Sequence, residues 1–194
     1  MPWLQTDEAE DVICSIEHCS ICLDLIDRNP VHWKWAIIAL QNALQGAMVC
    51  HLAGSANVGH LKASNATKWL NWYASGRVGE VPNEWMADPQ TLLERVAGQQ
   101  SRIEQGSGSA LSITEDEISA FKALNGLRKQ FAHFNPMGWS IQLDGLPHIF
   151  GLCASIIEKI SLDPWPFRHL ADAKRLQLIE AIDSLKQKIE SCQP

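Results

Sequence analysis

The chain has 194 residues and a formal net charge of −6, with 46% hydrophobic and 20% charged residues. This length and composition predict one globular domain with a sizeable core, and the negative charge excludes a globally basic nucleic-acid coat. Leu and Ala far outnumber Val, Thr and Tyr, which favours helices and excludes an all-β fold. The longest apolar run without a charge, 36–50, contains Gln and Asn and is too short to span a bilayer, so we expect no membrane segment.

Apolar residues recur at helical spacing along the first half of the chain. We predict helices over 7–27 and 32–52, with a short helical candidate over 63–73. Pro30 separates the first two helices, Gly54 ends the second, and Gly46 inside it indicates close approach by another helix. Residues 55–88 are rich in Gly, Ser, Asn and Pro, so we expect an irregular surface excursion there.

The second half of the chain contains four further helical stretches. They cover 89–105, 114–134, 147–161 and 163–190. The Gly/Ser segment 106–109 has the composition of a flexible linker, and Thr114 and Glu117 form a capping box that begins the next helix. Pro136 ends that helix, because the residue before a proline is pushed out of the α region. We therefore predict that residues 1–194 form a single-domain, all-α bundle of five to six helices.

Six cysteines raise the question of a metal site or a disulfide framework. Cys19 and Cys22 form a C-x-x-C pair, but the pair lies inside a predicted helix and no second pair accompanies it. Cys14, His18 and Cys22 share one helix face, yet the outer two lie about 12 Å apart along the axis, too far to hold one ion. We expect reduced, buried thiols, and neither a metal nor a cofactor.

Charge is segregated along the chain. Residues 1–27 carry seven Asp or Glu and no Lys or Arg, unlike the basic start of a signal peptide, so we expect a cytoplasmic protein. Residues 28–79 carry five Lys or Arg and no acid. This basic window also contains five aromatic residues, Trp33, Trp35, Trp69, Trp72 and Tyr73. The mixture is typical of surfaces that bind single-stranded nucleic acid, but aromatic side chains in a core are the favoured interpretation, because most aromatic residues are structural.

The helix predicted over 114–134 has two distinct faces. Its apolar face carries Phe121, Leu124, Leu127, Phe131 and Phe134 and is expected to face the core. The opposite face carries Lys122, Asn125, Gly126, Lys129 and His133, with no acid among them. Gly126 costs about 1 kcal/mol relative to Ala in a helix interior, which is explained if a substrate or another backbone approaches. We therefore take Lys122, Asn125 and Lys129 as candidate substrate-binding residues.

The segment 124–134, LNGLRKQFAHF, resembles the signature of the HEPN (higher eukaryote and prokaryote nucleotide-binding) domains. In these domains an Arg and a His, separated by four residues, lie late in an amphipathic helix of an all-α bundle; the matching residues are Arg128 and His133. The family usually places Asn, Asp or His directly after the Arg, and this chain has Lys129 there. That difference favours binding of an anion over chemistry.

The resemblance implies a metal-independent endoribonuclease that cleaves single-stranded RNA, or a non-catalytic relative that binds RNA, a nucleotide or a protein. Arg128 is then expected to stabilise the scissile phosphate, and His133 to transfer a proton at the ribose 2′-OH. The family commonly works as a homodimer in which two motifs meet. Besides a second copy of the chain and RNA or a nucleotide, a candidate partner is a protein that inhibits the activity.

Helix geometry supports a site shared between two copies. Five residues turn a helix by about 500°, so Arg128 and His133 point about 140° apart and do not converge on one phosphate. Pairing around a two-fold axis brings the Arg of one protomer near the His of the other. Five other histidines have no partner at a catalytic spacing in the sequence: His32, His51, His60, His148 and His169. The chain has no Gly-rich phosphate loop, H-E-x-x-H or G-x-S-x-G motif, so nucleotide hydrolysis, zinc proteolysis and α/β-hydrolase chemistry lack support.

Overall fold

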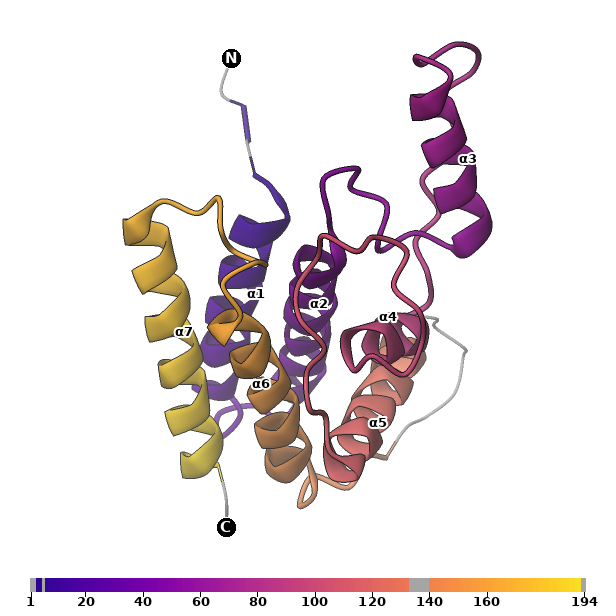
Figure 1. Ribbon diagram of the computed structural model, residues 1–194. Helices are drawn as coiled ribbons and strands as arrows, with labels where there is room; N and C mark the ends of the chain where they lie inside the picture. Colours follow the sequence, from indigo (N-terminus) through magenta and orange to yellow (C-terminus); the bar gives the residue numbers. More distant parts are fainter. Residues whose placement is uncertain (1–2, 5, 133–139, 193–194) are drawn as a thin grey trace.

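The computed structural model describes residues 3–4, 6–132 and 140–192, and these residues form seven α-helices and no strand (Figure 1). The helices are α1 (Glu8–Leu23), α2 (His32–Leu52), α3 (Ala63–Ala74), α4 (Pro89–Val96), α5 (Glu115–Ala132), α6 (Leu146–Leu162) and α7 (Asp172–Ser191). The predicted all-α class is confirmed, with seven helices in place of five to six. No helix in these described ranges is long and apolar enough to cross a membrane.

The helix at the centre of the bundle is α2, which packs against α1, α4, α5 and α6. Helix α7 covers α1 and α6 on one side, and α5 flanks α2 and α6 on the other (Figure 1). Helix α3 projects away from the remaining helices. The central position follows from the sequence of α2, since a helix that is apolar on most sides must be buried on most sides.

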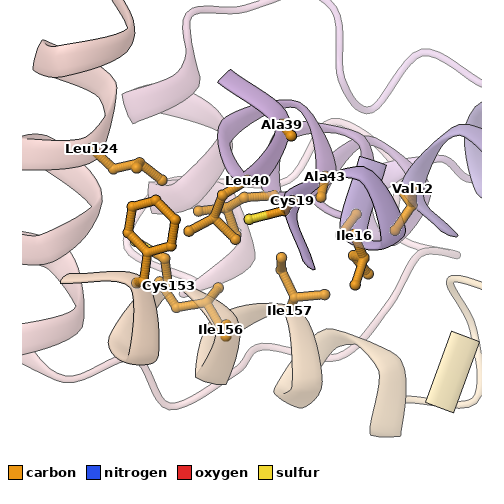
Figure 2. Packing of buried hydrophobic residues seen from close by; sticks show 14 of the residues in the cluster. Val12, Ile16, Cys19, Ala39, Leu40, Ala43, Leu124, Cys153, Ile156 and Ile157 are labelled. Carbon is orange, nitrogen blue, oxygen red and sulfur yellow. The ribbon is translucent and has the colours of Figure 1, made fainter. Parts of the chain in front are cut away.

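Small residues let α1 and α2 approach closely. A Cβ atom added at Gly46 would lie 2.8 Å from Cγ2 of Val12, so the approach predicted at this glycine is confirmed. Figure 2 shows side chains of four helices gathered in the same core: Val12, Ile16 and Cys19 from α1, Ala39, Leu40 and Ala43 from α2, Leu124 from α5, and Cys153, Ile156 and Ile157 from α6. Cys19, Cys22, Cys50 and Cys153 are buried thiols, as expected, but Cys14 is exposed and Cys192 is half-buried, so the prediction of buried thiols is wrong for these two.

Helix α4 is shorter than predicted, ending at Val96 instead of residue 105. Gly98 adopts a φ of +71°, a left-handed conformation that commonly ends a helix, and its N–H donates to the carbonyl of Arg95. Residues 99–114 therefore form a long loop that runs over the bundle to α5.

The last helix also begins later than predicted, at Asp172 instead of residue 163. Two prolines interrupt the intervening turns, and Trp165 anchors them by donating its indole N–H to the carbonyl of Ala53 at 2.8 Å. The Arg168 guanidinium stacks 3.8 Å from the centre of the Trp165 ring. The first helix ends at Leu23, and the turns that follow reach residue 28.

Hydrogen bonds hold the loop that contains the Gly/Ser segment 106–109. The N–H of Gly108 donates to the carbonyl of His51 at 2.8 Å, and the N–H of Ser109 donates to Asp163 at 2.8 Å. The His51 ring is fully buried and lies 2.8 Å from the Ser109 carbonyl, and burial lowers the pKa of this imidazole. The segment has the composition of a linker but packs as part of the fold.

Candidate functional site

The capping box fixes the start of the motif helix α5. The N–H of Thr114 donates to the Glu117 carboxylate at 2.8 Å, and the N–H of Glu117 donates to the Thr114 hydroxyl at 3.2 Å, as predicted. Lys159 of α6 also pairs with Glu117 at 2.7 Å. Burial alone would raise the pKa of Glu117, but the Lys159 ammonium and the Thr114 N–H together lower it. The first turn of α5 is thereby bound to α6.

The predicted apolar face of α5 faces the core. Phe121, Leu124 and Phe131 are buried, and Leu127 is half-buried. Phe134, the last residue of the predicted face, lies outside the described residues. The orientation of α5 about its axis, and hence which side chains it presents to solvent, follows from this packing.

A hollow of about 610 Å³ lies along α5 on the side of Lys122 and Gly126. Its α5 wall is completed by Ala123, Leu127 and Gln130, and its other wall comes from Ser140, Ile141, Gln142, Gly145, Leu146 and Ile149. The second wall belongs to the start of α6, which was predicted as a helix from residue 147, and to 140–145, for which no helix was predicted. The hollow is large enough for a nucleotide-sized ligand or for the side chains of a second protein.

The predicted site residues fall into different environments around α5. Lys122 is exposed and lines the hollow, whereas Asn125 and Lys129 do not line it. Arg128 is half-buried and has no hydrogen-bond or ion-pair partner within the described part of the chain. His133 lies outside the described residues, so the predicted pairing of Arg128 with His133 stays a prediction.

A smaller apolar hollow of about 330 Å³ adjoins the first, since both contain Ile141 and Leu146. Phe131 forms part of its wall together with residues from the start of α2 and the turn before it: Pro30, Val31, Trp33, Lys34 and Ile37. Sequence reasoning missed this feature, because its walls come from three separate parts of the chain. The only signal was the pair of apolar residues, Ile141 and Leu143, in a segment otherwise typical of a polar turn.

The aromatic residues of the basic window have divided roles. Trp33 packs edge to face on Phe150 at 5.3 Å, and Trp69 is buried, so these two rings belong to cores. Trp72 packs against Trp69 and is half-buried. Trp35 is 47% exposed, with the Lys34 ammonium 4.9 Å from its ring centre. The aromatic residues of the window are therefore neither all part of a core nor all available to a nucleic acid at the surface.

One exposed ring lies just outside the basic window and was not among the sequence candidates. Trp85 is 59% exposed, and the Lys62 ammonium lies 5.4 Å from its ring centre. Counting charges along the sequence could not find Trp85, because the basic window ends at residue 79 and two acids, Glu80 and Glu84, come before this ring. The positive charge that accompanies the ring is contributed by a residue far from it in sequence.

Comparisons with known proteins do not extend this picture. No protein-family model matches the chain, and neither a curated protein nor a solved structure matches it. Among the described residues, no group of three or more His, Cys, Asp and Glu side chains is arranged to hold a metal ion. The resemblance to the HEPN domains therefore rests on the sequence motif 124–134.

Proposed function

We propose that this protein is a HEPN-like, metal-independent endoribonuclease, in which Arg128 of one protomer and His133 of the other act on the same phosphate of single-stranded RNA. The observation that carries the proposal is the position of Arg128, which lies late in a capped helix of an all-α bundle. Its guanidinium has no acceptor among the described residues, so its hydrogen-bond donors are available to a phosphate.

The chemistry requires only these two side chains and the RNA itself. His133 accepts the proton of a ribose 2′-OH, and the resulting oxygen attacks the adjacent phosphorus. The 5′-oxygen of the next nucleotide leaves and takes a proton from water, and the protonated His133 returns its own proton to the solvent, so the products are a 2′,3′-cyclic phosphate and a 5′-hydroxyl. Arg128 stabilises the negative charge that accumulates on the phosphate oxygens in the transition state.

The cleavage test uses RNA in excess chelator. Arg128→Ala and His133→Ala are each expected to lower the cleavage rate by at least about 100-fold, because each removes transition-state stabilisation or proton transfer. Arg175→Ala and His169→Ala change the same residue types at exposed positions and are expected to cleave like the wild type. Cleavage that stops in chelator, or that both motif variants retain, contradicts the mechanism.

The proposed site needs a homodimer, and Gly126 offers a direct test of it. Among the described residues, a Cβ atom at Gly126 would meet nothing within 4 Å, so Gly126→Ala is expected to raise the free energy of unfolding by about 0.5–1 kcal/mol. If a second copy approaches this face, the added methyl group weakens the dimer. Urea unfolding measures the first effect and sedimentation equilibrium the second; a wild-type protein that stays monomeric at high micromolar concentration contradicts the shared site.

A second candidate function is binding without cleavage, and the hollow beside Lys122 and Gly126 favours it. Lys129 replaces the residue type usual in the family and presents a positive charge on the exposed side of the same helix. In this case the protein holds RNA, a nucleotide or an inhibitory partner protein. RNA that is bound but left intact by the wild type distinguishes this function from the first.

A further inference from the structure

Residues 60–87, which we call the arm, form a closed unit that projects from the bundle (Figure 1). The arm consists of α3 and the segment that returns from it. Two hydrogen bonds join its ends: the N–H of Ala87 donates to the carbonyl of His60 at 2.9 Å, and the N–H of Lys62 donates to the carbonyl of Trp85 at 2.8 Å. The returning segment is therefore held against the start of α3.

One face of α3 is used to attach the arm. Trp69 packs with Val58, Leu61 and Ala66 in a small core separate from the main one. Trp72 and Tyr73 pack against Trp69, with ring centres 5.3 and 5.6 Å from it. Trp72 stays half-buried at the edge of this face, where it also lines a groove.

A groove of about 450 Å³ runs between α3 and the returning segment. Its α3 wall is formed by residues at helical spacing, Lys68, Asn71, Trp72 and Ser75, and its other wall by Val78, Glu80, Val81, Pro82 and Asn83. The side-chain amide of Asn65 donates to the Asn83 carbonyl at 3.0 Å, which fixes the two walls relative to each other. The groove is thus a built feature of the arm.

The groove lining combines the groups that a nucleotide needs. Trp72 offers an aromatic ring, Asn71 an amide that can donate and accept, and Lys68 an exposed ammonium for a phosphate. Glu80, on the opposite wall, can accept a hydrogen bond from a base amino group and keeps phosphates on the side of Lys68. The Arg77 guanidinium lies 5.9 Å from the Trp72 ring centre and adds positive charge near the tip.

The exposed Trp85 ring lies on the same returning segment, at the base of the arm. With Lys62 over it, the arm carries three cations, each near an aromatic ring or in the groove, and two acids, Glu80 and Glu84. At the base of the arm, burial lowers the pKa of His60, and the negative charge of Glu84 partly offsets this effect. A large apolar ring in water beside a positive charge is the arrangement on which the bases of a single strand stack.

We propose that the arm binds single-stranded RNA, with one base in the groove against Trp72 and another stacked on Trp85, while Lys62 and Lys68 contact phosphates. The choice of RNA rests on the proposed function, which the arm serves by holding the strand outside the cleavage site. Binding at the arm itself does not depend on Arg128 or His133.

The test measures the affinity of a fluorescently labelled 2′-O-methyl RNA oligonucleotide, which lacks the 2′-OH and cannot be cleaved. The double variant Lys62→Gln with Lys68→Gln is expected to bind more weakly and to lower the slope of log affinity against log salt by about 1.4, or about 0.7 per phosphate contact. Lys174→Gln with Lys186→Gln makes the same change on α7 and is expected to leave the affinity and the slope unchanged.

Substitutions of the exposed ring separate stacking from charge. Trp85→Ala is expected to weaken binding about tenfold with the salt slope unchanged, and Trp85→Phe to retain most of the affinity because it keeps a ring. Trp35→Ala is the matched control, since Trp35 is also exposed beside a lysine but lies on α2. Circular dichroism confirms that each variant is folded.

The outcomes distinguish the two proposals. The arm proposal is overturned if the wild type does not bind the oligonucleotide, if the arm variants bind like the wild type, or if the control variants lose as much affinity as they do. If binding depends on the arm but the wild type leaves unmodified RNA intact, the cleavage proposal fails and the arm proposal stands.

Discussion

Glu104→Gln should lower the free energy of unfolding by about 4 kcal/mol, because this side chain is the acceptor for an entire loop. The Glu104 carboxylate is buried and accepts four backbone N–H groups at 2.7–3.1 Å, those of Gly54, Ala56, Val58 and Gly59. A glutamine has one acceptor oxygen and an NH₂ group that would face N–H donors. With its oxygen in the place of Oε2, which accepts three of these N–H groups, the glutamine would still turn its NH₂ group toward the N–H of Ala56 and leave that donor without an acceptor, at a cost of about 1–3 kcal/mol. The other three hydrogen bonds would lose the negative charge that strengthens them.

Urea unfolding followed by circular dichroism measures this effect. Glu180→Gln makes the same chemical change at an exposed position of α7 and is expected to unfold at the wild-type urea concentration. Equal midpoints for Glu104→Gln and the wild type would mean that the loop does not depend on the carboxylate. The arm begins directly after this loop, so the variant should also weaken binding of the oligonucleotide.

Helices with strong local signals were predicted closely. The bounds 32–52 predicted for α2 are those of the structure, and the capping box of Thr114 and Glu117 begins α5 as expected. In both cases the residues that set the helix end are its immediate neighbours in sequence. Capping and helix-breaking residues act within one turn, so a single sequence is enough to find them.

Contacts between distant residues explain where the helix predictions were wrong. Residues 99–105 were assigned to a helix, but Glu104 instead binds amides about 50 residues earlier in the chain. Gly98 was a local signal for the end of α4, and the prediction gave it too little weight. Residues 163–171 were also assigned to a helix, but they form turns anchored by the hydrogen bond from Trp165 to Ala53, which lies 112 residues earlier in the chain.

The candidate site was predictable only in part for the same reason. Helical periodicity identified Phe121 and Leu124 as buried and Lys122 as exposed. It could not supply the second wall of the hollow, which comes from 140–149, nor separate an exposed tryptophan from a buried one. Trp85 illustrates the point, because its charged neighbour Lys62 reaches it through the closure of the arm.

Gly59→Ala is expected to destabilise the protein more than a methyl group added at any other position of the loop under the arm. A Cβ atom there would lie 1.8 Å from the carbonyl oxygen and 2.8 Å from the carbonyl carbon of Leu52, the last residue of α2. The clash is with backbone, so no side-chain rotation relieves it. The free energy of unfolding should fall by about 4 kcal/mol or more, a loss typical of severe overpacking with broken hydrogen bonds.

Gly59 also cannot move aside without breaking other contacts. Its N–H donates to Glu104 at 2.8 Å, and its carbonyl accepts from the buried Arg95 guanidinium at 2.9 Å. Gly106→Ala is the matched control, because a Cβ atom at that position would meet no atom of the described part of the chain within 4 Å, and the variant should unfold like the wild type. If the two alanine variants show the same urea midpoint, the loop is free to shift, and the base of the arm does not depend on the contacts of Gly59 with Glu104 and Arg95.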